Sequence, residues 1–221
     1  DRFAESRMNH LSDRMPETML GRRVSDAFGK RLNETTRVEH VRLLGGSVPA
    51  AGSKSALRKA EGAPALFMTD LKTFIHNPTL QVETFGPSAI VVNCRGEQEL
   101  RDGAAAILGS LTASIWGDEY DGRLIKNLAS ALEQRVGRLV FNGAPTGVEV
   151  CTSMVHGGPY PASNQPHTTA VGPRALERWR RVVCFQNAPK DLLPPELQDE
   201  NPLMIRRLVD GRSTEGALDA A

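Results

Sequence analysis

The chain has 221 residues, of which 40% are hydrophobic, and this is enough to bury the core of one substantial domain. Its 27 lysine and arginine residues nearly balance 26 aspartate and glutamate residues, so its charge gives no reason to expect nucleic acid or an anionic membrane as a partner. The sequence has neither a signal segment nor a long apolar stretch, and we therefore expect a cytoplasmic protein that spans no membrane.

Helical and strand patterns alternate along the first two thirds of the chain. In chain order they predict a helix at 16–32, strands at 41–44, 65–69 and 88–94, a helix at 97–108, a strand at 111–116, a helix at 121–136 and a strand at 138–142. The run 88–94 is continuously apolar, which is typical of a strand buried on both faces. The alternation predicts an α/β fold whose strands are largely parallel.

The composition changes after Asn142. Residues 143–172 are rich in Gly, Pro, Ser and Thr, and a loop of this length in a compact domain is usually functional or disordered. Beyond it the pattern predicts a short helix at 174–181, a strand at 182–186 and helical structure around 203–209. We place a boundary after Gln186, which leaves 187–221 as a C-terminal tail.

No complete active site is evident in the sequence. It contains no glycine-rich dinucleotide fingerprint, no phosphate-binding P-loop, no serine nucleophile elbow and no zinc or calcium motif, so we expect no metal site. The three cysteines, Cys94, Cys151 and Cys184, are widely spaced and are expected to be free, mostly buried thiols in a reducing compartment.

A carboxylate and an aromatic ring precede the predicted strand at 88–94, in the segment Glu83-Thr84-Phe85-Gly86-Pro87. A carboxylate at this place can accept hydrogen bonds from both hydroxyls of a ribose, and the adjacent ring can pack against a flat heterocycle. The alternative is a solvated glutamate beside a turn.

The loop after Asn142 is a second candidate. A strand that ends in Asn-Gly and opens into a long loop commonly builds one wall of a pocket. Within this loop Cys151 and His156 are near each other in sequence, and they leave open a cysteine hydrolase as an alternative function.

Several motifs, taken in order, resemble the aldehyde dehydrogenase superfamily. They are Glu83-Thr84-Phe85-Gly86-Pro87, Leu108-Gly109-Ser110-Leu111-Thr112-Ala113 and Gly137-Arg138-Leu139-Val140-Phe141-Asn142-Gly143. The segments 145–150, 156–159 and 161–162 are similar to one subgroup, the α-ketoglutarate semialdehyde dehydrogenases. The resemblance covers nearly the whole chain and implies a three-layer α/β fold, namely the C-terminal part of the aldehyde dehydrogenase catalytic domain, with residues 1–186 in that domain.

The resemblance also implies a function and a set of residues. It implies oxidation of an aldehyde, α-ketoglutarate semialdehyde, to the carboxylate by a homo-oligomeric enzyme that uses NAD or NADP. Glu83 would contact the nicotinamide ribose, and Phe85 would lie on the nicotinamide side. The position and composition of the loop predict that its substrate-lining residues are Pro145, Thr146, Val150 and His156.

The same resemblance places the family's dinucleotide-binding domain, general-base glutamate and nucleophilic cysteine upstream of Asp1. None of the three cysteines has the sequence context of that nucleophile, so we assign no catalytic residue and expect the isolated chain to be inactive. A non-catalytic truncated or binding protein that retains the fold is the alternative, and the sequence upstream of Asp1 would distinguish the two.

Overall fold

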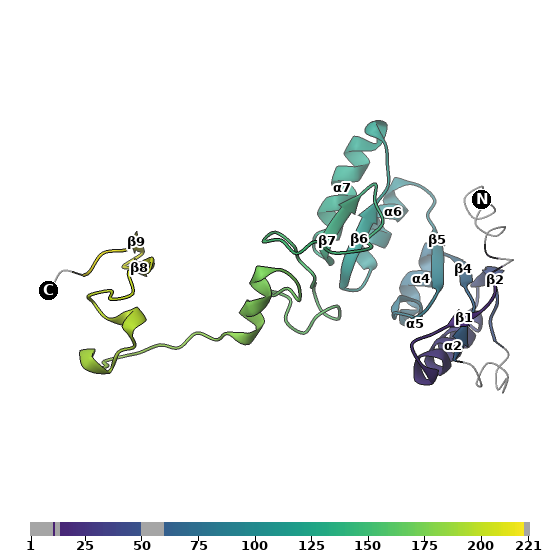
Figure 1. The fold of residues 1–221 in the computed structure, drawn as a ribbon. Coiled ribbons are helices and arrows are strands. Elements are labelled where there is room, and N and C mark those ends of the chain that lie inside the picture. The colour runs from purple at the N-terminus through teal and green to yellow at the C-terminus, as the bar shows by residue number, and fades with distance from the viewer. Residues whose placement is uncertain (1–10, 12–13, 50–59, 219–221) are drawn as a thin grey trace. The chain divides into compact units, whose positions relative to one another are not determined.

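The computed structural model describes residues 11, 14–49 and 60–218. These residues form two compact units, of which the first ends at Arg178 and the second begins at Trp179 (Figure 1). The boundary expected after Gln186 falls inside the second unit and stays a prediction.

A three-stranded sheet and one long helix form the first core. The sheet has the order β2-β4-β5, in which β4 is antiparallel to β2 and parallel to β5. Phe28 and Leu32 of the helix α2 pack against Ala65 and Phe67 of β4. The elements of this region are β1 (Glu17–Thr18), α2 (Arg22–Thr36), β2 (Arg42–Gly46), β3 (Glu61–Gly62), β4 (Ala65–Asp70), α4 (Leu71–His76), α5 (Pro78–Gln81) and β5 (Ser88–Asn93).

Two parallel strands and two helices form the second core of this unit. β6 (Ser110–Ile115) pairs with β7 (Val136–Phe141) in parallel register, so that Ile115 lies opposite Phe141. The helices are α6 (Glu97–Ala106) and α7 (Gly122–Leu132), and a 3-10 turn, η1 (Glu119–Asp121), precedes α7. Because Leu128 and Leu132 of α7 pack on Ile115, the helix faces the sheet with its apolar side.

Polar side chains hold much of the second unit together. The amide of the buried Asn201 bonds the backbone of Ile205 and Glu215, and Arg207 donates to the carbonyl oxygens of Gln198 and Asp199. The regular elements of this unit are η3 (Lys190–Leu192), η4 (Pro195–Leu197), β8 (Arg207–Val209) and β9 (Arg212–Thr214), and η2 (Pro173–Trp179) ends at its first residue.

The expected α/β fold is confirmed, but the strands are not largely parallel: among the described residues, three of the five strand pairs are antiparallel. Particular elements are also corrected. The first helix begins at Arg22 rather than at residue 16, because Gly21 has an extended backbone and residues 17–18 pair as a strand with β3. The strand β5 is not buried on both faces: its residues are exposed or half-buried along their length. It pairs with β4, and within the described residues no strand pairs with its other edge.

Two elements expected near the C-terminus are wrong. Residues 182–186 form no strand, and Val182 is 100% exposed, because no neighbouring strand among the described residues pairs with this segment. Residues 203–209 form no helix; the positive φ angles of Asp210 and Gly211 instead close a hairpin between β8 and β9.

We expect Phe67→Ala to lower the free energy of unfolding by about 3–5 kcal/mol, because it leaves a cavity in the first core. Phe67 is 1% exposed and packs among Phe28, Leu32 and Ala65. Leu20→Ala is the control, since Leu20 is 87% exposed and its truncation should change stability by less than about 0.5 kcal/mol. Urea unfolding followed by circular dichroism measures both; equal midpoints for the two variants would contradict this assignment of the core.

Candidate functional site

The strand β7 ends in an asparagine that joins it to the end of β6. The Asn142 side chain accepts a hydrogen bond from the Gly117 amide (3.0 Å) and donates one to the Gly117 carbonyl (2.9 Å). Its own backbone amide donates to the carbonyl of Ile115 (2.9 Å), and its φ of 48° is left-handed. Asparagine is among the few non-glycine residues that adopt this conformation readily, so one residue both turns the chain and fixes its exit from the sheet.

The residues that follow, 143–156, form the post-β7 loop. An arginine near the start of β7 reaches this loop. Arg138 donates from Nη2 to the carbonyl oxygen of Pro145 (3.1 Å) and from Nη1 to that of Gly147 (3.0 Å), and Nη1 also lies 3.8 Å from the Met154 sulfur. The loop is therefore hydrogen-bonded at two positions, Pro145 and Gly147, to the side chain of one strand residue.

The chain then returns to the beginning of the β6–β7 pair, where glycine permits close backbone contact. A Cβ atom at Gly137 would lie 2.1 Å from the carbonyl oxygen of Gly157, and a Cβ at Gly109 would lie 2.3 Å from that of Tyr160. The segment 157–160 therefore packs directly on the backbone of Gly137 in β7 and of Gly109 just before β6, where any larger residue would displace it.

A buried threonine, Thr169, forms hydrogen bonds that hold the backbone of His156 at the end of the loop. The Thr169 hydroxyl accepts a hydrogen bond from the His156 amide (2.9 Å) and donates to the carbonyl of Val171 (2.9 Å), while the Ala170 amide donates to the carbonyl of His156 (2.9 Å). His156 is thus held by its backbone, and its half-buried ring forms no hydrogen bond with any described residue.

Three of the four predicted lining residues, Pro145, Thr146 and Val150, are exposed on the post-β7 loop. Val150 is an exposed apolar side chain, 76% accessible. The structure brings these three residues into one loop held by Arg138, and it places His156 at the loop's far end beside Thr169.

The predicted ribose-contacting segment forms a corner before β5. Gly86 packs on the first core so closely that a Cβ there would lie 2.4 Å from the Phe28 ring. The amide of Ala65 donates to the Pro87 carbonyl (3.0 Å), which ties the corner to β4. Glu83 is exposed, Phe85 is 62% exposed, and no described residue forms a hydrogen bond or ion pair with Glu83. Both groups are therefore uncovered.

Among the described residues, no cysteine forms a hydrogen-bonded pair with a histidine. The Cys151 sulfur lies 3.4 Å from the Ser153 hydroxyl, and no described residue connects it to His156 by a hydrogen bond. Burial, with a smaller contribution from the charge of Glu99, raises the pKa of the Cys94 thiol, which makes it a poorer nucleophile. All three thiols are free, as expected, but the expectation that most are buried is wrong: Cys94 and Cys151 are half-buried and Cys184 is exposed.

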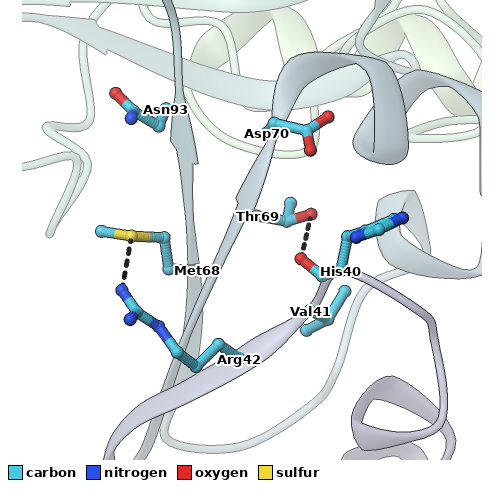
Figure 2. A pocket seen from close by; sticks show the side chains of 7 residues that line it. All are labelled: His40, Val41, Arg42, Met68, Thr69, Asp70 and Asn93. Carbon is cyan, nitrogen blue, oxygen red and sulfur yellow. Dashed lines mark hydrogen bonds between the residues drawn. The ribbon is translucent and has the colours of Figure 1, made fainter.

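A cavity of about 400 Å³ lies beside the C-terminal ends of β4 and β5 (Figure 2). Its walls carry charges of both signs, from Arg42 and Asp70, and Nη2 of Arg42 lies 3.6 Å from the Met68 sulfur. The hydroxyl of Thr69 donates to the His40 carbonyl (3.1 Å). The amide of Thr73 donates to the Asp70 carboxylate (2.8 Å), and this hydrogen bond is the main reason that the pKa of Asp70 is lowered.

Within residues 11, 14–49 and 60–218, no group of three or more His, Cys, Asp or Glu side chains is arranged to hold a metal ion. Among the helices of these ranges, none combines the length and hydropathy that a bilayer crossing requires.

Arg138 and Asn142, which hold the loop, were not predicted from the sequence. A signal existed for each: Arg138 is a charged residue within an otherwise apolar strand, and Asn142 precedes a glycine at the strand's end. Thr169 carried no comparable signal, because its partners lie in a loop without periodicity.

Comparison with curated proteins gives relatives along almost the whole chain, although no family model matches it. An alpha-ketoglutaric semialdehyde dehydrogenase from Azospirillum brasilense is 38% identical over 213 residues, which are 96% of this chain and 39% of that protein. Another, from Acinetobacter baylyi, is 37% identical over 216 residues, 97% of this chain and 40% of the relative. The chain therefore spans about two fifths of the length of these curated relatives.

Solved structures with a similar fold include two enzymes at low sequence identity. A betaine aldehyde dehydrogenase from Staphylococcus aureus has a TM-score of 0.60 and 14% identity, covering 85% of this chain and 39% of that one. A salicylaldehyde dehydrogenase from Pseudomonas putida has a TM-score of 0.58 and 17% identity, covering 85% and 37%. This likeness shows that the fold is shared.

We expect Asn142→Ala to lower the free energy of unfolding by about 1–2 kcal/mol, because two hydrogen bonds to Gly117 are lost and alanine disfavours the left-handed φ. The control is Thr146→Ala, which removes an exposed side chain that forms no hydrogen bond with described residues and should change stability by less than about 0.5 kcal/mol. Chemical unfolding curves give both values, and an Asn142→Ala protein as stable as the control would show that the junction does not depend on this side chain.

Proposed function

Because the chain corresponds to one section of the aldehyde dehydrogenase superfamily, we propose that the protein carrying it oxidises an aldehyde to a carboxylate with NAD or NADP. The observation that carries this proposal is the 38% identity sustained over 213 residues. The proposed substrate is α-ketoglutarate semialdehyde, because both curated relatives bear the name of a dehydrogenase of that compound.

Support for a dinucleotide cofactor comes from neighbours and from the corner before β5. The betaine aldehyde dehydrogenase was solved with NAD+, and a succinic semialdehyde dehydrogenase from Streptococcus pyogenes with NADP+. In this chain the Glu83 carboxylate and the Phe85 ring are both uncovered, which suits residues that contact a ligand. A bound dinucleotide would supply the hydride acceptor for the aldehyde.

The chain's own residues then have distinct proposed roles. The Glu83 carboxylate accepts hydrogen bonds from the two ribose hydroxyls, which restrains the nicotinamide nucleoside relative to the substrate. Phe85 packs on the nicotinamide side. Pro145, Thr146, Val150 and His156 line the path of the aldehyde, where exposed apolar surface such as Val150 excludes water from the reacting carbon.

This section supplies binding and orientation, and the proposed nucleophile and phosphate-binding residues belong to the remainder of the enzyme. Cys151 is held near Ser153 rather than paired with His156, so the hydrolase alternative gains no support from the geometry. The alternative of a non-catalytic protein that retains the fold is an outcome of the experiment below. The homo-oligomeric state and the cytoplasmic location stay predictions.

The test is to express the full-length protein that contains this section and to follow NADH or NADPH formation with α-ketoglutarate semialdehyde, succinic semialdehyde and betaine aldehyde. We expect turnover with α-ketoglutarate semialdehyde, with kcat/KM at least about tenfold higher than for the other two. The isolated 221-residue chain, tested alongside, should reduce neither cofactor. Absence of turnover with every aldehyde in the full-length protein would favour the non-catalytic alternative, and turnover by the isolated chain would refute the division of roles.

Glu83→Gln in the active protein should slow hydride transfer or weaken cofactor binding about ten- to a hundredfold, since a hydrogen bond to a charged acceptor is worth about 1.5–3 kcal/mol. Single-turnover reduction of NAD and NADP measures the step, with thermal unfolding as the check on folding. The matched control is Glu133→Gln, another exposed glutamate, located just after α7, which should leave rate and affinity within a factor of about two. If both variants behave alike, Glu83 is a surface residue beside a turn.

A further inference from the structure

We propose that Arg138 is the positioning residue of the aldehyde site: it fixes the conformation of the post-β7 loop and so determines how well that loop binds the aldehyde. This inference rests on the proposed function, because it takes the loop as the wall of the substrate path. It assigns to the arginine no contact with substrate or cofactor.

Arg138 forms hydrogen bonds with the two residues that flank Thr146, one of the proposed substrate-lining residues. The two carbonyl oxygens that it binds belong to Pro145 and Gly147, on either side of Thr146. Gly147 has a φ of 77°, so the chain turns sharply at this point. A guanidinium presents its donors in a fixed planar fork, and binding two carbonyls with that fork fixes the turn between them.

Little else holds this part of the loop. Residues 143–148 contain no helix or strand, and 144–150 are all exposed. Within the part of the chain that the structure describes, the hydrogen bonds of Arg138 are the ones that join residues 143–148 to the rest of the unit, because the next backbone bonds begin at Cys151. The loop's conformation therefore depends on this side chain more than on its own backbone.

The contacts of this half-buried arginine indicate positioning rather than ligand binding. Its Nε atom is buried without a hydrogen-bond partner, and its two Nη atoms are engaged by the loop. Each Nη atom therefore already donates to a carbonyl oxygen of the loop, and the guanidinium serves as a link between β7 and the loop. The side chain lies between strand and loop, where the Met154 sulfur contacts the same Nη1 atom.

The first measurement uses the 221-residue chain and the glutamate within the loop. Glu149 is a cleavage site for a glutamate-specific protease, and we expect Arg138→Gln to accelerate cleavage there about tenfold, because the loop opens locally more often. The reference in the same digest is Glu39, whose side chain is exposed outside the loop. Arg135→Gln, an exposed arginine three positions earlier, is the matched control and should leave both sites unchanged.

The second measurement uses the active full-length protein. Arg138→Gln should raise the KM for the aldehyde about tenfold while kcat falls by less than about threefold and the Kd of the dinucleotide stays unchanged, because only the substrate-facing wall loses order. Arg138→Lys retains the charge but replaces the planar fork by a single ammonium, so its KM should lie between those of wild type and Arg138→Gln. Arg135→Gln should match wild type.

The outcomes separate this inference from the proposed function. If the wild-type protein oxidises aldehydes but Arg138→Gln leaves the KM unchanged, the inference is overturned, whatever happens to cleavage at Glu149. An equal loss of aldehyde and cofactor binding would also overturn it, since that result describes general unfolding. If the wild type oxidises no aldehyde, the proposed function fails first, and the inference about substrate binding fails with it.

Discussion

The post-β7 loop depends on hydrogen bonds from side chains of the strand that precedes it. A backbone without helix or sheet partners must satisfy its polar groups through side chains or water, and only the side chains specify one conformation. Asn142 fixes where the chain leaves β7, and Arg138 fixes where it turns back. Both lie on or directly after the same strand, so the packing of β7 on β6 and α7 determines the position of the whole loop.

Glycine provides the second constraint on this region. At Gly109 and Gly137 the returning segment approaches strand backbone more closely than any side chain permits. Close backbone packing at these glycines holds the C-terminal end of the loop. Hydrogen bonds from the charged guanidinium of Arg138 hold its N-terminal part. His156 lies between these two kinds of attachment and is held through its backbone by Thr169 and Ala170.

The corner at Glu83 is positioned in another way, by the hydrophobic core. Gly86 packs against the ring of Phe28, which is itself buried against β4, and the Pro87 carbonyl accepts a bond from Ala65 at the start of that strand. Because the contacts of Gly86 and Pro87 with the core fix the backbone of this corner, Glu83 and Phe85 are exposed but their positions in the fold are well defined. The residues proposed to contact the cofactor are thus positioned by buried residues of the first core, Phe28 and Ala65.

The sequence by itself determined α7, because burial of one helix face imposes an apolar period, and β4, because a short continuous apolar run is typical of a strand buried on both faces. The ordered motifs around Glu83 and after Asn142 also identified the family section before any geometry was known. The tertiary structure alone decided the exposure of β5 and the lack of a strand at 182–186, since strand formation depends on a partner that local sequence does not specify. It also decided the role of Arg138, because the carbonyls of Pro145 and Gly147 come within reach of the guanidinium only when the loop folds back along β7.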